Sequence, residues 1–140
     1  MGIIYLVVPL DPEVSAWLDR EAIDHPPASP TARGPSPREV LDALDALDGL
    51  RSRIDKQVQQ GRVDIEVEDA REGRSTSIRL SECLSDDRPC QLAFSKGSEE
   101  LIGSILNAIS SLCGPLVLVP DSGEDPTVFR ASPAPPAWHG

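Results

Sequence analysis

Apolar residues recur at helical spacing after Ser98 and then form an unbroken run. The stripe repeats with the 3.6-residue period of one helix face and comprises Leu101, Ile102, Ile105, Leu106, Ile109, Leu112 and Cys113. Ser98 is a suitable N-cap, and Gly114 followed by Pro115 ends the helix. Residues 116–119 lack polar alternation, which predicts an interior strand covered on both faces.

A second unbroken apolar run lies near the N-terminus. Residues 3–8 read Ile-Ile-Tyr-Leu-Val-Val, which predicts another central strand beside 116–119. Asp11, Pro12 and Glu13 then have the order of an N-cap, a first helical position and a first-turn acid. The short helix that they predict has one apolar face, formed by Val14, Trp17, Leu18 and Ala22.

A capping box at residues 36–39, Ser-Pro-Arg-Glu, starts the next helix. Its buried stripe is predicted to be Val40, Leu41, Leu44 and Leu47. The helix ends at Asp48 and Gly49 or continues through Ile54 to Gly61. The good helix formers Arg, Lys and Gln between these points slightly favour continuation.

The clearest alternation follows. Val63, Ile65 and Val67 alternate with Asp64, Glu66 and Glu68, and a similar pattern returns over 76–80 after a turn. This predicts an antiparallel hairpin with one face on the core and one in water. Residues 91–94 predict a third, shorter strand, and Val128 with Phe129 can begin another.

These elements predict an α+β fold in one domain over residues 1–130. We expect a single mixed or antiparallel sheet of about five strands with helices packed on one face, a ferredoxin-like variant. Residues 25–37 are rich in proline and predict an exposed, disordered loop, and residues 131–140 predict a proline-rich flexible tail.

The charge balance narrows the classes of partner. The chain carries 23 acidic and 13 basic side chains among 140 residues, for a net charge of −10. Nucleic acids and anionic membranes require clustered Lys and Arg, so neither is an expected partner. A cationic partner is permitted, although acidity also serves solubility alone.

The cysteines and the N-terminal run indicate a compartment. Cys83, Cys90 and Cys113 are odd in number, and their spacing fits neither a zinc site nor a disulfide framework. Buried thiols in a reducing environment are the simpler interpretation. Residues 3–8 are too few for a signal core or a membrane span, so the expected location is cytoplasmic.

Catalytic signatures are missing from the sequence. The two histidines, His25 and His139, lie in proline-rich segments that give no rigid support, and no nucleophile elbow or phosphate loop occurs. Asp121, Glu124 and Asp125 follow a predicted strand and could bind Mg²⁺ or Ca²⁺, but their spacing matches no defined metal-binding loop, and an ordinary solvated turn is the favoured interpretation. We therefore expect no enzyme activity, no cofactor and no metal site.

The most distinctive surface feature is the outward acidic row. It comprises Asp64, Glu66 and Glu68, extended by Asp69 and Glu72. Carboxylates at alternate strand positions repel one another unless cations lie opposite, and Arg71, Arg74 and Arg79 are placed to neutralise part of the row. The row is either a solvated face or a rigid acidic surface for a basic protein, and the candidate partner-binding residues are Asp64, Glu66, Glu68, Asp69 and Glu72.

The chain resembles the small bacterial immunity proteins encoded beside polymorphic or contact-delivered toxins. The similarity lies in its size, its acidity, the uninterrupted start Met-Gly-Ile-Ile-Tyr-Leu-Val-Val-Pro, the missing catalytic groups and the exposed alternating hairpin. The resemblance implies stoichiometric binding of a cognate toxin with a basic face and occlusion of its active site. It assigns no contact residue, because such families share none.

Three functions remain open at this point. The first is a protein-binding inhibitor that uses the acidic sheet face. The second is a small-molecule or metal-sensing regulatory domain built around residues 121–125, and the third is an enzyme with an unfamiliar carboxylate site. The first accounts for the most features of the sequence.

Overall fold

A computed structural model describes residues 4–28 and 32–129. Its strands form one antiparallel sheet in the order β2-β3-β4-β5-β1-β6-β7. The strands are β1 (Ile4–Pro9), β2 (Leu50–Gln57), β3 (Arg62–Asp69), β4 (Arg74–Ser81), β5 (Gln91–Gly97), β6 (Leu116–Pro120) and β7 (Thr127–Phe129). The helices are α1 (Pro12–Arg20), α2 (Pro37–Ala46), α3 (Glu99–Cys113) and the short 3-10 helix η1 (Val58–Gln60).

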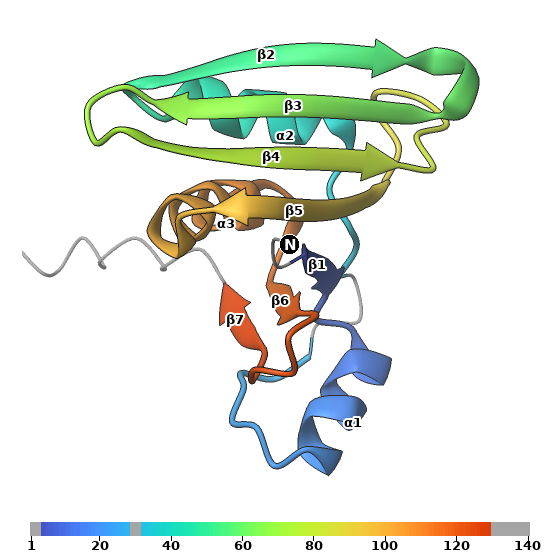
Figure 1. Cartoon of the computed structure of the whole chain (residues 1–140). Coiled ribbons are helices and arrows are strands. Elements are labelled where there is room, and N and C mark those ends of the chain that lie inside the picture. The colour runs from blue at the N-terminus through green and yellow to red at the C-terminus, as the bar shows by residue number, and fades with distance from the viewer. Residues whose placement is uncertain (1–3, 29–31, 130–140) are drawn as a thin grey trace, which may run out of the picture.

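The main core lies between the sheet and the pair α2 and α3, which lie behind the strands in Figure 1. We call this covered side the inner face. α3 contributes most of its predicted stripe to it, and β3 contributes the predicted Val63, Ile65 and Val67. The caps predicted for both helices are confirmed: the Ser98 side chain accepts from the Leu101 amide, and Ser36 and Glu39 form the capping box of α2.

The opposite side, the outer face, is covered at one end by α1. Leu18 of α1 packs with Leu10 and Val117 in a second apolar cluster, supported by Val8 and Val119. Because side chains alternate along a strand, Val117 points away from the main core that contains its neighbours in β6. The prediction that residues 116–119 are covered on both faces is confirmed, and β1 is their antiparallel neighbour as expected.

The predicted fold needs two corrections. Within residues 4–28 and 32–129 the sheet has seven strands rather than about five and is antiparallel throughout, so the ferredoxin-like variant is wrong, although the α+β class holds. The helices do not share one face, because α1 lies on the outer face and α2 and α3 on the inner.

Continuation of the second helix to Gly61 is also wrong. α2 ends at Ala46, and residues 50–57 form β2 at the edge of the sheet. The inner-facing side chains of an edge strand lie beside solvent and need not be apolar. Because Ser52 and Lys56 are polar, residues 50–57 lack the alternation of apolar and polar residues that predicts a strand.

The loop predicted at 25–37 is ordered in its second half. Pro35 and Ser36 are buried, and the Cys90 amide donates to the Pro35 carbonyl oxygen at 2.9 Å. Arg33 reaches Glu39 with a bidentate pair at 2.6 and 2.8 Å. Residues 32–37 thus form specific contacts that the sequence did not predict, while the predicted tail at 131–140 lies outside the described residues.

Candidate functional site

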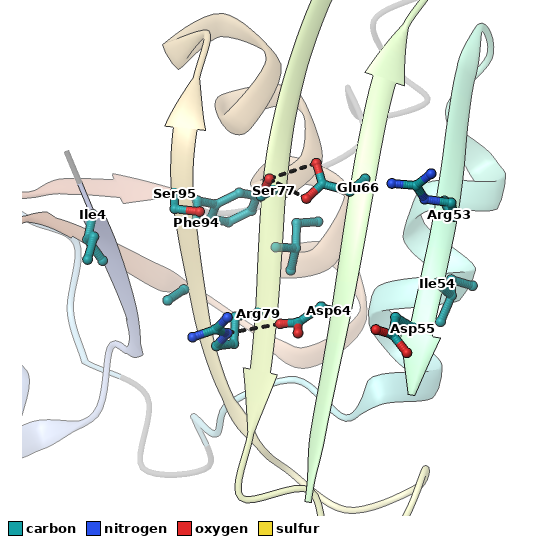
Figure 2. Close-up of a pocket in the computed structure, with 12 residues that line it drawn as sticks. Ile4, Arg53, Ile54, Asp55, Asp64, Glu66, Ser77, Arg79, Phe94 and Ser95 are labelled. Carbon is teal, nitrogen blue, oxygen red and sulfur yellow. Dashed lines mark hydrogen bonds and ion pairs between the residues drawn. The ribbon is translucent and has the colours of Figure 1, made fainter. Parts of the chain in front are cut away.

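The outer face of β2, β3, β4 and β5 carries no covering helix within the described part of the chain. A hollow of about 810 Å³ lies over it, extending from Arg53 and Asp55 on β2 to Ile4 on β1 (Figure 2). Small side chains, Ser77 of β4 with Ala93 and Ser95 of β5, lie between these two borders. The floor of the hollow is therefore low because these side chains are short.

The predicted acidic row follows β3 on this face. Glu66 and Glu68 are exposed and Asp64 is partly buried, while the residues between them are buried in the core. The strand register places Arg51 opposite Glu68 and Arg53 opposite Glu66 on β2. The predicted outward orientation is confirmed for Asp64, Glu66 and Glu68, but arginines that the sequence did not assign to this face lie beside them.

Two cations lie close to Asp64. Its carboxylate is 2.9 Å from Arg79 Nε and 3.3 Å from Arg62 Nε. Ser77 lies opposite Glu66 in the strand register, and its hydroxyl donates to the Glu66 carboxylate at 2.8 Å (Figure 2). The carboxylates are thus neutralised or hydrogen-bonded locally, and the face displays alternating charge instead of a purely acidic surface.

The charges on the outer face of β2, β3 and β4 balance. They comprise four arginines and four carboxylates: Arg51, Arg53, Arg62, Arg79, Asp55, Asp64, Glu66 and Glu68. The net charge of −10 therefore arises elsewhere in the chain. A partner would contact a mixture of positive and negative side chains. Such a mixture favours one relative orientation of the two proteins rather than a strong net attraction.

Asp69 and Glu72 do not share the outer face with the rest of the row. Asp69 is buried at the end of β3, where its carboxylate accepts the backbone amides of Arg71 and Glu72 and pairs with Arg74 at 3.2 Å. Burial acts to raise the pKa of Asp69, but the hydrogen bonds from Arg74 and the two amides outweigh it and the pKa is lowered. Asp69 thus shapes the hairpin turn in which Glu72 lies exposed.

Sequence reasoning missed the apolar border of the face. Leu6 is 52% exposed and Ile4 is 46% exposed, although both belong to the apolar run predicted to form a central strand. They lie opposite Ala93 and Ser95 of β5, next to the hollow. The signal was present in the sequence, since residues 91–95 place small or polar side chains opposite them, but the pairing of β1 with β5 was not foreseen.

The other candidate groups serve structure. His25 is held by Asp19 at 2.8 Å and by the Pro26 carbonyl at 2.7 Å, which raises its pKa and engages both ring nitrogens. The Asp121 carboxylate accepts the Ile4 amide, and the Asp121 amide donates to the Ile4 carbonyl, so Asp121 extends the pairing of β1 with β6. His139 lies outside the described residues.

Metal ligation and thiol chemistry find no support in residues 4–28 and 32–129. No group of three His, Cys, Asp or Glu side chains there could hold a metal ion. A second hollow of about 680 Å³ is lined by Cys83 and Cys90, but burial raises the pKa of both thiols, that of Cys90 to about 12. Burial also raises the pKa of Cys113 to about 11, so these thiols remain protonated near neutral pH.

Comparisons of the chain with family models, curated proteins and solved structures give no match. In the part of the chain that the structure describes, no helix has the length and apolar character needed to cross a membrane.

Proposed function

We propose that the protein binds another protein through the outer face of β1 to β5 and inhibits it stoichiometrically. The observation that carries this proposal is the uncovered face itself. There Ile4 and Leu6, each about half exposed, lie beside the charged side chains of β2, β3 and β4. Apolar surface beside a polar rim is typical of protein interfaces. A sheet also holds such side chains in fixed relative positions, which a binding surface requires.

The charge pattern defines the partner further. A purely basic partner face would meet Arg51, Arg53 and Arg79 as well as the acidic row, and like charges in contact oppose binding. The partner that we propose therefore presents both signs of charge and an apolar contact for Leu6. The resemblance to small bacterial immunity proteins supports a toxin as this partner, with its active site occluded in the complex.

The proposed location is the cytoplasm, where an inhibitor would meet a toxin that has entered the cell. The three cysteines are free in the structure, which is the expected state in a reducing compartment.

Charge reversal tests the proposal. The full chain is immobilised and exposed to a lysate of its source organism, beside Glu66→Lys/Glu68→Lys and a control, Asp42→Lys/Asp45→Lys. The control makes the same change of charge on exposed positions of α2, away from the outer face. We expect one protein to be retained by the wild type and the control but not by the outer-face variant.

The retained protein is then purified and its activity is titrated with the chain. Inhibition that is complete at equal concentrations supports the proposal. Retention of the same protein by Glu66→Lys/Glu68→Lys would exclude the outer face as the binding surface, and a wild-type chain that retains no specific protein would overturn the proposal.

A further inference from the structure

Among the described residues, β2 forms one edge of the sheet, and one side of its backbone has no neighbouring strand. It is eight residues long, and β3 is its neighbour on the other side (Figure 1). Its side chains from Arg51 to Lys56 are all exposed. A long exposed edge is a template for pairing with another strand, so proteins either shield such edges or use them.

The middle of β2 carries three side chains that suit a second strand. Ile54 is 43% exposed, which is unusual for an aliphatic residue on the inner side of the sheet. Arg53 and Asp55 flank it on the outer side, opposite Glu66 and Asp64 of β3. Neither forms an ion pair with another described side chain, whereas Asp64 has two.

Self-pairing of β2 is restricted by geometry. Two copies related by a twofold axis perpendicular to the sheet pair antiparallel, and residues directly opposite share a face of the sheet. The axis must therefore pass beside a single residue, which faces its own copy. Residues equally spaced on either side of it then face each other across the pair.

One register satisfies the charges of β2. An axis beside Arg53 or Asp55 places like charges directly opposite each other, and an axis beside Ser52 places Arg51 opposite Arg53. An axis beside Lys56 opposes two lysines. Only an axis beside Ile54 faces Arg53 with Asp55 of the second copy, twice by symmetry, and joins the two Ile54 side chains.

We propose that the protein forms a homodimer through antiparallel pairing of β2 with β2 of a second copy, centred on Ile54. The two sheets become continuous, Ser52 faces Lys56 of the second copy, and the exposed apolar surface of Ile54 is covered. The dimer includes Arg53 of the proposed binding face, but β3, β4 and β5 lie between the β2 edge and Leu6 on β1, so the two contacts can be tested separately.

A charge swap tests the register. In the Arg53→Glu variant, a glutamate of one copy would lie opposite Asp55 of the other copy. In the Asp55→Arg variant, an arginine of one copy would lie opposite Arg53 of the other. Each like-charge pair occurs twice in the dimer. Each single variant should raise the dimer dissociation constant roughly tenfold or more in analytical ultracentrifugation. The double variant Arg53→Glu/Asp55→Arg restores opposite charges and should return the constant to within about threefold of the wild type.

Cross-linking gives a second test that needs no charge. Opposed Cα atoms in an antiparallel pair lie about 4.5–5.5 Å apart, within the range of a disulfide. Ile54→Cys should therefore form a covalent dimer under mild oxidation. Ser52→Cys is the control, because its two copies would lie about 14 Å apart.

The results are decisive in either direction. A wild-type chain that stays monomeric up to high micromolar concentration would overturn the dimer, and so would single reversals without effect or a swap that fails to restore pairing. Equal cross-linking at positions 52 and 54 would overturn the register. A monomer that still retains its protein partner would separate failure of this inference from failure of the proposed function.

Discussion

The two ends of the outer face belong to the same sheet, but a helix covers only one of them in the described residues. At β6, Val117 and Val119 lie in an apolar cluster closed by α1, and Leu18 of that helix is fully buried. At β3 and β4 the same face carries ordered charges such as Asp64 and Arg79 and has no helix over it in the described residues. The end of the outer face with apolar side chains is therefore covered by a helix, and the end with charged side chains is not.

β1 lies at the boundary between these two regions. Val8 packs into the cluster beneath α1, whereas Leu6, on the same side of the strand, is half exposed. Antiparallel sheets with one face in water commonly place polar residues at the exposed positions. The exposed aliphatic side chain of Leu6, beyond the reach of α1, is the feature on which we base the proposed binding surface.

The largest expected effect lies in the covered region. Leu18→Ala removes a fully buried side chain from the α1 cluster and should lower the free energy of unfolding by about 2–5 kcal/mol. Leu6→Ala is the matched control and should cost less than about 1 kcal/mol, because half of its side chain is already in water. Urea unfolding measures both, and equal losses would contradict the difference in coverage.

An intermediate effect is expected at the start of α2, which covers the inner face. The hydrogen bonds from Arg33 are the largest cause that lowers the pKa of Glu39, whose carboxylate also accepts the Ser36 amide. Because the folded-state pKa is lowered, this stabilisation is complete above the ordinary value of 4.5 and is lost as pH falls through the folded value.

Glu39→Gln keeps an acceptor for the Ser36 amide but removes the charge. It should destabilise the protein by about 1 kcal/mol at pH 7, with a smaller difference from wild type at pH 3. Thermal unfolding across this range measures it. A difference that does not shrink in acid would show that the ionised carboxylate is not the stabilising form.

The smallest effect on stability is expected on the uncovered face. Arg79 is 59% exposed and pairs with Asp64, and exposed ion pairs of this kind contribute less than about 1 kcal/mol. Arg79→Gln should therefore change the unfolding free energy by less than that amount, and less still at high salt. A loss above about 2 kcal/mol would mean that the charges of this face serve stability.

Local signals account for the elements that the sequence predicted. Ser98 and the stripe of α3 are read within one helix, and the capping box at Ser36 needs only its own first turn. The alternation of β3 also identified its buried face, because Val63 and Val67 belong to a strand with a neighbour on each side. These predictions needed no knowledge of distant contacts.

The missed features depend on long-range pairing. The pattern of residues 50–57 slightly favours a helix, because the edge position of β2 removes the need for apolar residues, and the predicted acidic row therefore omits the arginines of β2. Asp69 was grouped with the acidic row, although a buried position in the turn directs it elsewhere. The exposure of Leu6 depends on where α1 ends its coverage, which no local pattern records.

The central claim is that the outer face beside β1 binds a protein partner. The direct measurement is the affinity of the retained partner for Leu6→Asp and for Leu112→Asp, a similarly exposed leucine of α3 that does not lie on the outer face. Circular dichroism should show both variants folded. The account predicts that Leu6→Asp weakens binding at least roughly thirtyfold while Leu112→Asp stays within about threefold of the wild type. A folded Leu6→Asp variant that binds as tightly as the wild type would contradict it.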